Sequence, residues 1–503
     1  MNISPNISHK AQRKWNTPKI LKLGMYCCWG GSLIFSIASY KLIAQQRDAI
    51  VTIGKDSAPS IINAQKLKDA IAGMNAFAAN ELITPSGQNL AAMQGYRERY
   101  ERMSERLVLV AENITYGEKE RQPITILQKG IGDYIAALQN AKDANIQGNT
   151  NLKLQAFRQA SDLMDRTLLP AVNALKKANL DELEKSYQTQ KIMHGRSMFI
   201  IFTLGIFVLA LLITLQTFLS QRTKRTFNLG LLAATAIAGG FLFYTLSILN
   251  SSSQALKIAK EDAFDSIDPL REIRSLFYGI LSDESRYLLD PALAKQYEQA
   301  FKQKSSHIAN LSLEQFPLVT AAVKQNRPFH PFSGLLANEI KNITFLGERA
   351  AVAETLGRLG DYLGIDAHIR QLEKTGKHSE AVALIDRQIS LFHLRLQQLS
   401  AKSPNAAVCA NSKTPDCFLT QFMDANLKTY AINKNYFYRG LDKALQAVGG
   451  YKVNLPPDKN LEQLGEIEPK NLDEFVLIDI LATTAICLLI LYGLLSRFRE
   501  YEA

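Results

Sequence analysis

The sequence predicts an all-α membrane protein with four transmembrane helices and two exported antiparallel helical bundles in tandem. The first observation is a pair of uncharged apolar runs, 197–219 and 227–249, joined by a basic loop at 220–226. Each run exceeds the roughly 20 apolar residues that a helix needs to cross a bilayer, and neither has a polar face at helical spacing. The second is a further apolar block near each end, 23–44 and 475–496. The third is helical spacing of apolar residues between the blocks, in 45–196 and 250–474.

The positive charge predicts the orientation. Most of the net charge of +11 lies in the leader 1–22 (Lys10, Arg13, Lys14, Lys19, Lys22) and in the loop (Arg222, Lys224, Arg225). Basic residues also follow the last block, in the tail 497–503. The positive-inside rule then places both termini and the loop in the cytoplasm, as expected for a multi-pass protein of the bacterial inner membrane. It also explains the charge without a nucleic-acid partner. A cleaved signal peptide is the alternative for block 23–44, but the leader is long and no small-x-small site follows Tyr40.

The cysteines agree with an oxidising location for the second exported region. Cys409 and Cys417 are separated by a short segment there, which predicts a disulfide. Two free thiols remain the alternative. The other three cysteines lie inside spans, where they behave as small apolar residues. No Cys/His pattern with zinc-ligand spacing occurs, so we expect no metal site and no cofactor.

The first exported region predicts four long helices with short turns, an up-down bundle. The first runs over 45–84 and ends at Pro85-Ser86-Gly87, and the second runs over 89–114. The third has Pro123 near its start and extends to about 148. The fourth, 152–193, leads into the second span, and Pro170 is expected to kink it. The first and last bundle helices therefore continue the spans.

The second exported region begins like the first. The segment Ile258–Ala263 (IAKEDA) echoes Ile53–Ala58 (IGKDSA), which favours a duplicated unit of span, bundle and span. Chance similarity between two amphipathic helices is the rival explanation. Further helices are predicted near 292–312, 335–375, 379–402 and 418–447, with a proline-containing linker at 450–470 before the last span.

Catalytic motifs are missing from the sequence. It contains no phosphate-binding glycine loop, HExxH or GxSxG motif, and its histidines are scattered singly. The three predicted cytoplasmic segments are far shorter than the ~100 residues of an ordinary domain. We therefore expect no enzyme and no intracellular output module, so that any signal must pass to another chain.

Glu284 is the first candidate site residue. It lies on the apolar stripe of the second bundle, and the matching residue of the first bundle is Ala78. A carboxylate on a core seam requires a partner, so Glu284 is expected to meet a base or a ligand, with Asp283 and Arg286 beside it. The alternative is that Glu284 lies at the edge of the seam and is solvated.

A second candidate segment is Asn338–Phe345 with Gly347-Glu348-Arg349, from which Asn342, Glu348 and Arg349 are the candidate binding residues. The mixture of amides and apolar residues is compatible with a ligand rim or with a helix start. Asp479, inside the last span, is expected to reach the membrane interface.

Three segments resemble a known family: Asp283–Pro291 (DESRYLLDP), Gly334–Ala351 (GLLANEIKNITFLGERAA) and Arg222–Thr235 (RTKRTFNLGLLAAT). They resemble the four-span transmembrane partner of the bacterial glutamine-sensing, protein kinase G pathway, mainly over 197–400. The resemblance implies a periplasmic amino-acid-binding protein outside and a soluble kinase inside. Thr167–Val172 (TLLPAV), before a long helix, is similar to four-helix sensory domains of chemoreceptors and sensor kinases.

These observations predict a non-enzymatic membrane sensor that relays a signal through its helices. The basic residues Arg222, Lys224 and Arg225 are the expected docking site for a cytoplasmic kinase. The lipid bilayer is an expected partner, and a periplasmic binding protein and a homodimer are compatible with the sequence. A structural membrane scaffold is the alternative function.

Overall fold

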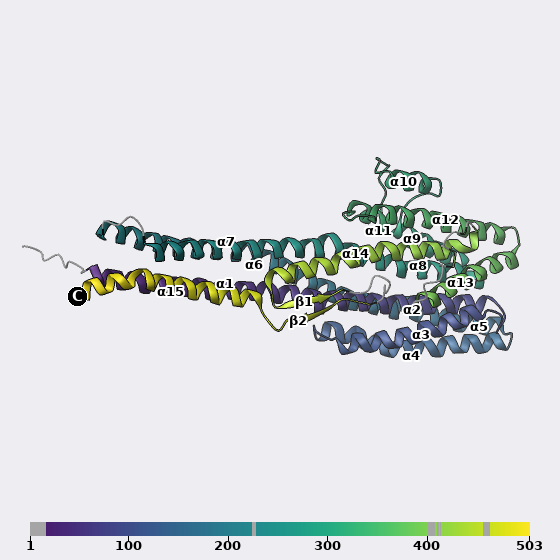
Figure 1. The fold of residues 1–503 in the computed structure, drawn as a ribbon. Coiled ribbons are helices and arrows are strands. Elements are labelled where there is room, and N and C mark those ends of the chain that lie inside the picture. The colour runs from purple at the N-terminus through teal and green to yellow at the C-terminus, as the bar shows by residue number, and fades with distance from the viewer. Residues whose placement is uncertain are drawn as a thin grey trace, which may run out of the picture.

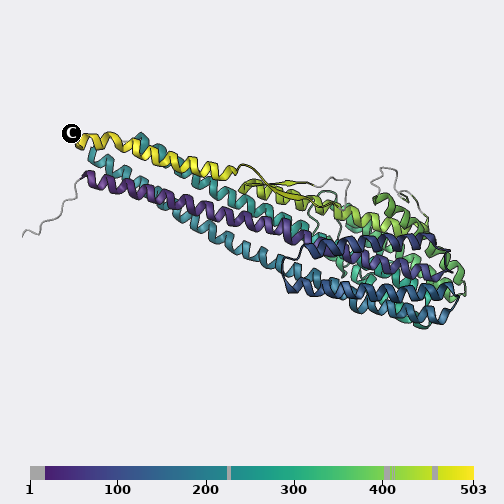
Figure 2. The same ribbon diagram turned by 90° about the horizontal axis from the view of Figure 1, so that it is seen from below.

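A computed structural model describes residues 17–223, 228–400, 408–409, 412, 414–455 and 463–502. These residues form a long rod of helices (Figure 1). At one end four helices run side by side, which we call the stalk; at the other end the remaining helices widen the rod into a head (Figures 1 and 2). The first helix begins, and the last helix ends, at the free end of the stalk. The connection between the second and third stalk helices lies at the same end.

The stalk consists of four helices that are long and apolar enough to cross a bilayer. Three of them continue without interruption into the head, in helical runs of 67, 73 and 61 residues (Thr17–Ile83, Thr150–Arg222 and Leu229–Leu289). At 1.5 Å per residue these runs are about 90 to 110 Å long. The fourth, Glu474–Arg499, is confined to the stalk. The predicted all-helical, multi-pass membrane fold is confirmed.

The stalk helices approach closely at small residues. A side chain at Gly230 would lie 2.8 Å from the Cα atom of Gly493, so the two helices touch through their backbones. Asn228 donates from Nδ2 to the carbonyl of Gly493 at 2.6 Å. Asp479 is buried and lies 3.5 Å from the Thr483 hydroxyl, which donates to it. Thr483 lies one turn further along the same helix. The expectation that Asp479 reaches the membrane interface stays a prediction.

The first half of the chain, which we call the first unit, forms the predicted four-helix arrangement in the head. A short π-helical turn lies just before Pro170, which cannot donate a backbone hydrogen bond to the preceding helical turn. The elements are α1 (Thr17–Val51), η1 (Thr52–Ser57), α2 (Ala58–Ile83), α3 (Leu90–Glu112), α4 (Glu118–Ile146), α5 (Thr150–Leu163), η2 (Met164–Leu168) and α6 (Leu169–Thr223).

The second half of the chain, the second unit, departs further from the prediction. Its elements are α7 (Leu229–Lys257), η3 (Ile258–Phe264), α8 (Asp265–Leu289), η4 (Pro291–Leu293), α9 (Ala294–Ile308), α10 (Gln315–Lys324), α11 (Leu335–Lys341), α12 (Glu348–Lys374), α13 (His378–Ser400), η5 (Pro415–Cys417), α14 (Phe418–Val448), β1 (Tyr451–Asn454), β2 (Glu466–Pro469) and α15 (Glu474–Glu502). Helix α10 and the antiparallel pair β1–β2 were not predicted.

The helix predicted over 335–375 is two helices, α11 and α12. The break falls at Gly347, whose φ of +85° is unfavourable for other residues. Glu348 stabilises the turn, since its Oε2 accepts the backbone N–H groups of Thr344 at 2.8 Å and Phe345 at 2.9 Å. Carboxylates at a helix start satisfy N–H groups that have no helical partner.

Both units share a framework beyond the echo seen in the sequence. The echoing segments fold as π-helical turns, η1 and η3, where the stalk meets the head. In each unit an Asn-Ile-Thr turn then donates its Asn side chain back to a serine after that π-helix, Asn113 to Ser60 at 2.6 Å and Asn342 to Ser266 at 2.8 Å. This common framework supports duplication over chance similarity.

The two units pack side by side through α2 and α8 rather than as separate bundles (Figures 1 and 2). This contact includes polar pairs: Asn75 donates to the Ser282 hydroxyl at 2.9 Å, and Lys68 pairs with Glu272. One apolar core also extends across both units, and in it the ring of Phe77 stacks on that of Phe392 with 6.3 Å between the ring centroids. The bundles are thus tandem in sequence and parallel neighbours in space.

Candidate functional site at the junction of stalk and head

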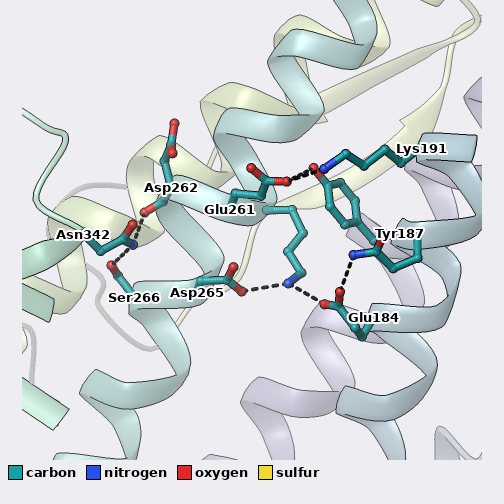
Figure 3. Close-up of polar contacts among 10 residues, drawn as sticks. Glu184, Tyr187, Lys191, Glu261, Asp262, Asp265, Ser266 and Asn342 are labelled. Carbon is teal, nitrogen blue, oxygen red and sulfur yellow. Dashed lines mark hydrogen bonds and ion pairs between the residues drawn. The ribbon is translucent and has the colours of Figure 1, made fainter. Parts of the chain in front are cut away.

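A polar network joins η3 and the start of α8 to α6 where the stalk meets the head (Figure 3). Lys260 of η3 lies at its centre. Its Nζ atom donates to Glu184 Oε2 at 2.8 Å and to Asp265 Oδ1 at 2.8 Å. Glu184, on α6, also accepts a hydrogen bond from Gln188 at 2.7 Å. Lys260 therefore connects the helix entering the second span to the helix leaving the third.

Glu261, the next residue of η3, makes a second contact with α6. Tyr187 of α6 donates its hydroxyl to Glu261 Oε1 at 2.9 Å, and Lys191 approaches the same oxygen at 3.4 Å (Figure 3). A π-helix widens the backbone ring by one residue, so it shifts neighbouring side chains around the helix relative to an α-helix. Here this geometry allows consecutive residues, Lys260 and Glu261, both to reach α6.

The ionisation of the network is set by burial and by pairing. Burial disfavours the charged form of Lys260, yet hydrogen bonds to Asp265 and Glu184 outweigh it and raise the pKa of that amine. Burial also acts against the Glu261 carboxylate, but its bonds to Tyr187 and Lys191 lower its pKa. Both groups are thus charged at neutral pH, and the network is an ionic link.

The opposite side of η3 is held by the Asn-Ile-Thr turn of the second unit. Asn342 donates to the carbonyl of Asp262 at 3.1 Å and to the Ser266 hydroxyl (Figure 3). In the first unit, Tyr116 from the corresponding turn shares a 2.7 Å hydrogen bond with Ser57 at the end of η1. Each π-helical turn, or the residue just after it, is therefore hydrogen-bonded by the Asn-Ile-Thr turn of its own unit.

Helix α14 contacts both π-helical turns. A Cβ atom on Gly54, inside η1, would lie 2.7 Å from Leu441 of α14, and one on Gly440 of α14 would lie 2.9 Å from Ala259 of η3. Both approaches require glycine. The junction is thus a packed layer of η1, η3, α6 and α14, in which displacement of one element presses on the others.

The predicted site residues do not form one site. Asn342 contacts Ser266 near the start of α8, whereas Glu284 is 18 residues further along that helix, about 27 Å away at 1.5 Å per residue. Asn342 and Glu348 organise the α11–α12 turn. Arg349 lies half-buried on the first turn of α12. Of the two interpretations of this segment, the helix start describes what the structure shows.

Glu284 is buried rather than solvated, with 1% of its surface exposed. Tyr362 of α12 donates its hydroxyl to Glu284 Oε2 at 2.7 Å. Burial, reinforced by the nearby carboxylate of Asp366, raises the pKa of Glu284 to about 8. The predicted seam position is therefore correct, but the partner is a tyrosine and not a base.

The neighbours of Glu284 are paired within the chain. Asp283 pairs with Lys304 and lies 3.5 Å from Arg286. Arg286 donates to Asp165 of the first unit at 2.8 Å. Arg286 thus belongs to the contact between units, whereas Asp283 is paired within the second unit.

A cavity of about 890 Å³ opens between α10 and α12. Its walls include Phe316 and Thr320 of α10 and the small residues Gly357 and Gly360 of α12. Its size is within the range of small-ligand sites.

The remaining predicted positions are at the periphery. Cys409 and Cys417 form a disulfide. Arg222 ends its helix exposed at the free end of the stalk, while Lys224 and Arg225 lie outside the described residues. In the described part of the chain, no group of three or more His, Cys, Asp or Glu side chains could hold a metal ion.

Sequence reasoning missed Lys260, Glu261, Glu184 and Tyr187 as a site. The signal was present, because Lys260 and Glu261 lie inside the repeated segment, but we interpreted that segment only as evidence of duplication. Their partners on α6 are remote in sequence, so only the fold brings them together.

Residues 49–188 match the family model described as an actinobacterial sensor domain. The match begins at the end of α1, spans the head portion of the first unit and ends on α6 beside the junction network. No curated protein and no solved structure matches the chain. The chain is thus similar to a sensory domain family over this stretch, which indicates a sensory or signalling role.

Proposed function

We propose that this protein is a non-enzymatic membrane sensor that detects a small ligand, or a ligand-loaded binding protein, outside the cytoplasm and relays the signal to a separate cytoplasmic partner. The observation that carries the proposal is the continuity of α6 from the sensor-like head through the junction network to the basic end of the stalk. Glu184 and Arg222 lie on this one helix. Their separation is about 57 Å at 1.5 Å per residue.

The junction network supports a specific route. Lys260 ties α6 to η3, above the two spans whose other ends are joined by the loop 220–226. A stimulus that changes how the two units pack in the head would move α6 relative to η3. Helix shifts of about 1–2 Å are typical of such transitions. The shift would thus reach the ends of α6 and α7, between which the basic loop lies in the sequence.

The polar contact between α2 and α8 supports movement between the units. Polar interfaces between domains permit relative motion more readily than large apolar ones. The ion pair Lys68–Glu272 belongs to a network, since Lys176 of α6 also pairs with Glu272 at 2.9 Å. The resemblance to the glutamine-sensing pathway suggests a soluble protein kinase as the partner.

Lys260→Met tests the route, and Lys185→Met, an exposed lysine on α6, is the matched control. In the full chain, spin labels placed at the ends of α6 and α7 next to the loop should report a changed distance for Lys260→Met and none for Lys185→Met. Equal distances in both variants and the native protein would remove the network from the route.

The partner is tested by replacing Arg222, Lys224 and Arg225 with Ala. We expect recovery of a cytoplasmic kinase with the purified chain to fall at least tenfold. Unchanged recovery would reject this docking site.

Thermal unfolding of the full chain with a panel of amino acids separates sensor from scaffold, because a ligand that binds only the folded state raises the midpoint of unfolding. A flat response to the panel and to a binding protein would favour the scaffold.

Orientation is tested with Leu346→Cys. Leu346 is 91% exposed on the head, and a membrane-impermeant thiol reagent should label Cys at this position in intact cells. Arg222→Cys should be labelled only after permeabilisation. The reverse pattern would place the head in the cytoplasm and end the proposal.

A further inference from the structure

Two buried carboxylates distinguish the second unit from the first. Glu284 and Ala78 each lie seven residues before the proline that follows the first head helix of their unit. Glu339 and Val110 each lie three residues before the asparagine of the Asn-Ile-Thr turn. All four side chains are buried. The same framework therefore contains apolar residues in one unit and carboxyl groups in the other.

Glu284 has no base of its own. Arg370 of α12, the basic group that acts on the pKa of Glu284, makes two hydrogen bonds to Asp366, both at 2.8 Å. Tyr362 occupies only one oxygen of Glu284, and Oε1 has no hydrogen-bond partner among the described residues. Helix α9 adds Glu298 and Lys302, both of which act on Asp366. An ionised Glu284 would therefore face another carboxylate that already holds the local arginine.

Glu339 faces a carboxylate as well. Glu348 of α12 is fully buried, and the Asn433 side chain of α14 donates to both, at 2.7 Å to Glu348 and 3.4 Å to Glu339. Helix α8 contributes the neutral hydroxyl of Ser266. Among these contacts the second acidic group is Glu348, and no base offsets ionisation of Glu339 in this apolar environment.

We propose that the second unit is a pH-responsive element, in which loss of a proton from Glu284 or Glu339 loosens α8 and α11 from α12 and α14. The ligand is the proton, and each step is simple ionisation of a carboxylic acid to solvent. The response does not depend on the relay function, since it is a property of the packing of the second unit.

The direction follows from the difference between folded and opened states. Burial and the facing carboxylate raise the pKa of both Glu284 and Glu339 to about 8, while an exposed glutamate titrates near 4.5. A raised pKa in the folded state means that folding binds a proton between these values, so stability is fully present below pH 4.5 and is lost as the pH rises to about 8. The opening constant should rise by up to roughly tenfold per pH unit for each carboxylate.

Hydrogen exchange of the full chain in bilayer discs of neutral lipid, at pH 6, 7, 8 and 9, measures this opening after correction for the chemical exchange rate. In the native protein, peptides from α8, α11 and α12 should open progressively more up to pH 8, while those from α3 and α4 serve as the internal comparison. Glu284→Gln should flatten the response of α8, and Glu339→Gln that of α11.

The matched control is Glu354→Gln, which removes an exposed carboxylate of α12 and should leave the native pH response unchanged. If Glu339→Gln does not fold, Glu339→Val introduces the residue of the first unit at that position. The proposal is overturned if the native protein shows a flat response, or if the response persists when both glutamates are replaced. Hydrogen exchange in peptides from α8 reports on Glu284, and exchange in peptides from α11 reports on Glu339. Each carboxylate therefore tests the pH response separately.

Discussion

The first and second units agree at the junction with the stalk and differ inside the head. Both have a π-helical turn, an Asn-Ile-Thr turn that binds back to a serine, and a glutamate that accepts backbone N–H groups of that turn. Inside the head the first unit has Phe77 and Ala78 where the second has Asp283 and Glu284. The parts that both copies keep are those that connect to the spans.

A second difference concerns how each interior accommodates its polar groups. In the first unit, Asn113, Glu120 and Asn179 line a water-sized cavity of about 10 Å³. In the second unit Asn433 of α14 bonds to Glu339 and Glu348. The first interior thus contains a small cavity where the second contains a carboxylic acid. The junction is thus the part that the two units share, whereas the head interiors differ.

Exchanging the residues that differ should have the largest effect. Ala78→Glu would place a carboxylate in a fully buried position with no partner designed for it, and we expect a loss of about 4 kcal/mol or more in the free energy of unfolding. Glu284→Ala removes a poorly paired buried carboxyl group but leaves a void and frees the Tyr362 hydroxyl, so we expect about 2 kcal/mol. Denaturant unfolding of the full chain measures both. Similar losses for the two variants would contradict the contrast between the interiors.

Neutralising the glutamate of each turn should have an intermediate effect. Glu120 accepts the N–H groups of Thr115 and Tyr116 at 2.7 and 2.6 Å, as Glu348 does for its own turn. Glu120→Gln should cost about 2 kcal/mol, because bonds from backbone N–H to a carboxylate are lost. Glu348→Gln should cost less, about 1 kcal/mol, since it also removes the acidic group that raises the pKa of Glu339.

The control for this pair is Glu118→Gln. Glu118 neighbours Glu120 in sequence, but its side chain is 79% exposed, so unfolding should be unchanged within about 0.5 kcal/mol. A larger loss for Glu348→Gln than for Glu120→Gln would show that the two turns are not equivalent in the proposed way.

Removing one hydroxyl should have the smallest effect. Tyr116→Phe gives the first turn the ring that the second turn already has in Phe345. In the second unit the Phe345 ring stacks on Tyr436, with 3.9 Å between the ring centroids. The loss of the bond to Ser57 should cost about 1 kcal/mol or less. We expect faster hydrogen exchange in η1 (Thr52–Ser57) with no change in α4. Unchanged exchange in η1 would mean that this bond does not hold the π-helical turn.

Much of the predicted fold was correct because it depends on the apolar spacing and the breaker residues within each segment. The helices of the first unit follow from apolar spacing and from breaks such as Pro85 and Gly87. The break at Gly347 was missed because the apolar spacing continues across it, and the decisive interaction is the return of Glu348 to its own turn. The pair β1–β2 was missed because each strand is short and is defined by its partner.

The sequence by itself determined the four apolar spans, the all-helical architecture and the basic end of the stalk, because hydropathy and charge over some twenty residues need no knowledge of neighbours. Only the tertiary structure decided that Glu284 is buried against Tyr362, that the six predicted site residues fall in separate places, and that Lys260 bridges α6 and η3. These facts depend on the rotation of one helix against another. Partners more than seventy residues apart, such as Glu184 and Lys260, meet only when the whole chain is folded.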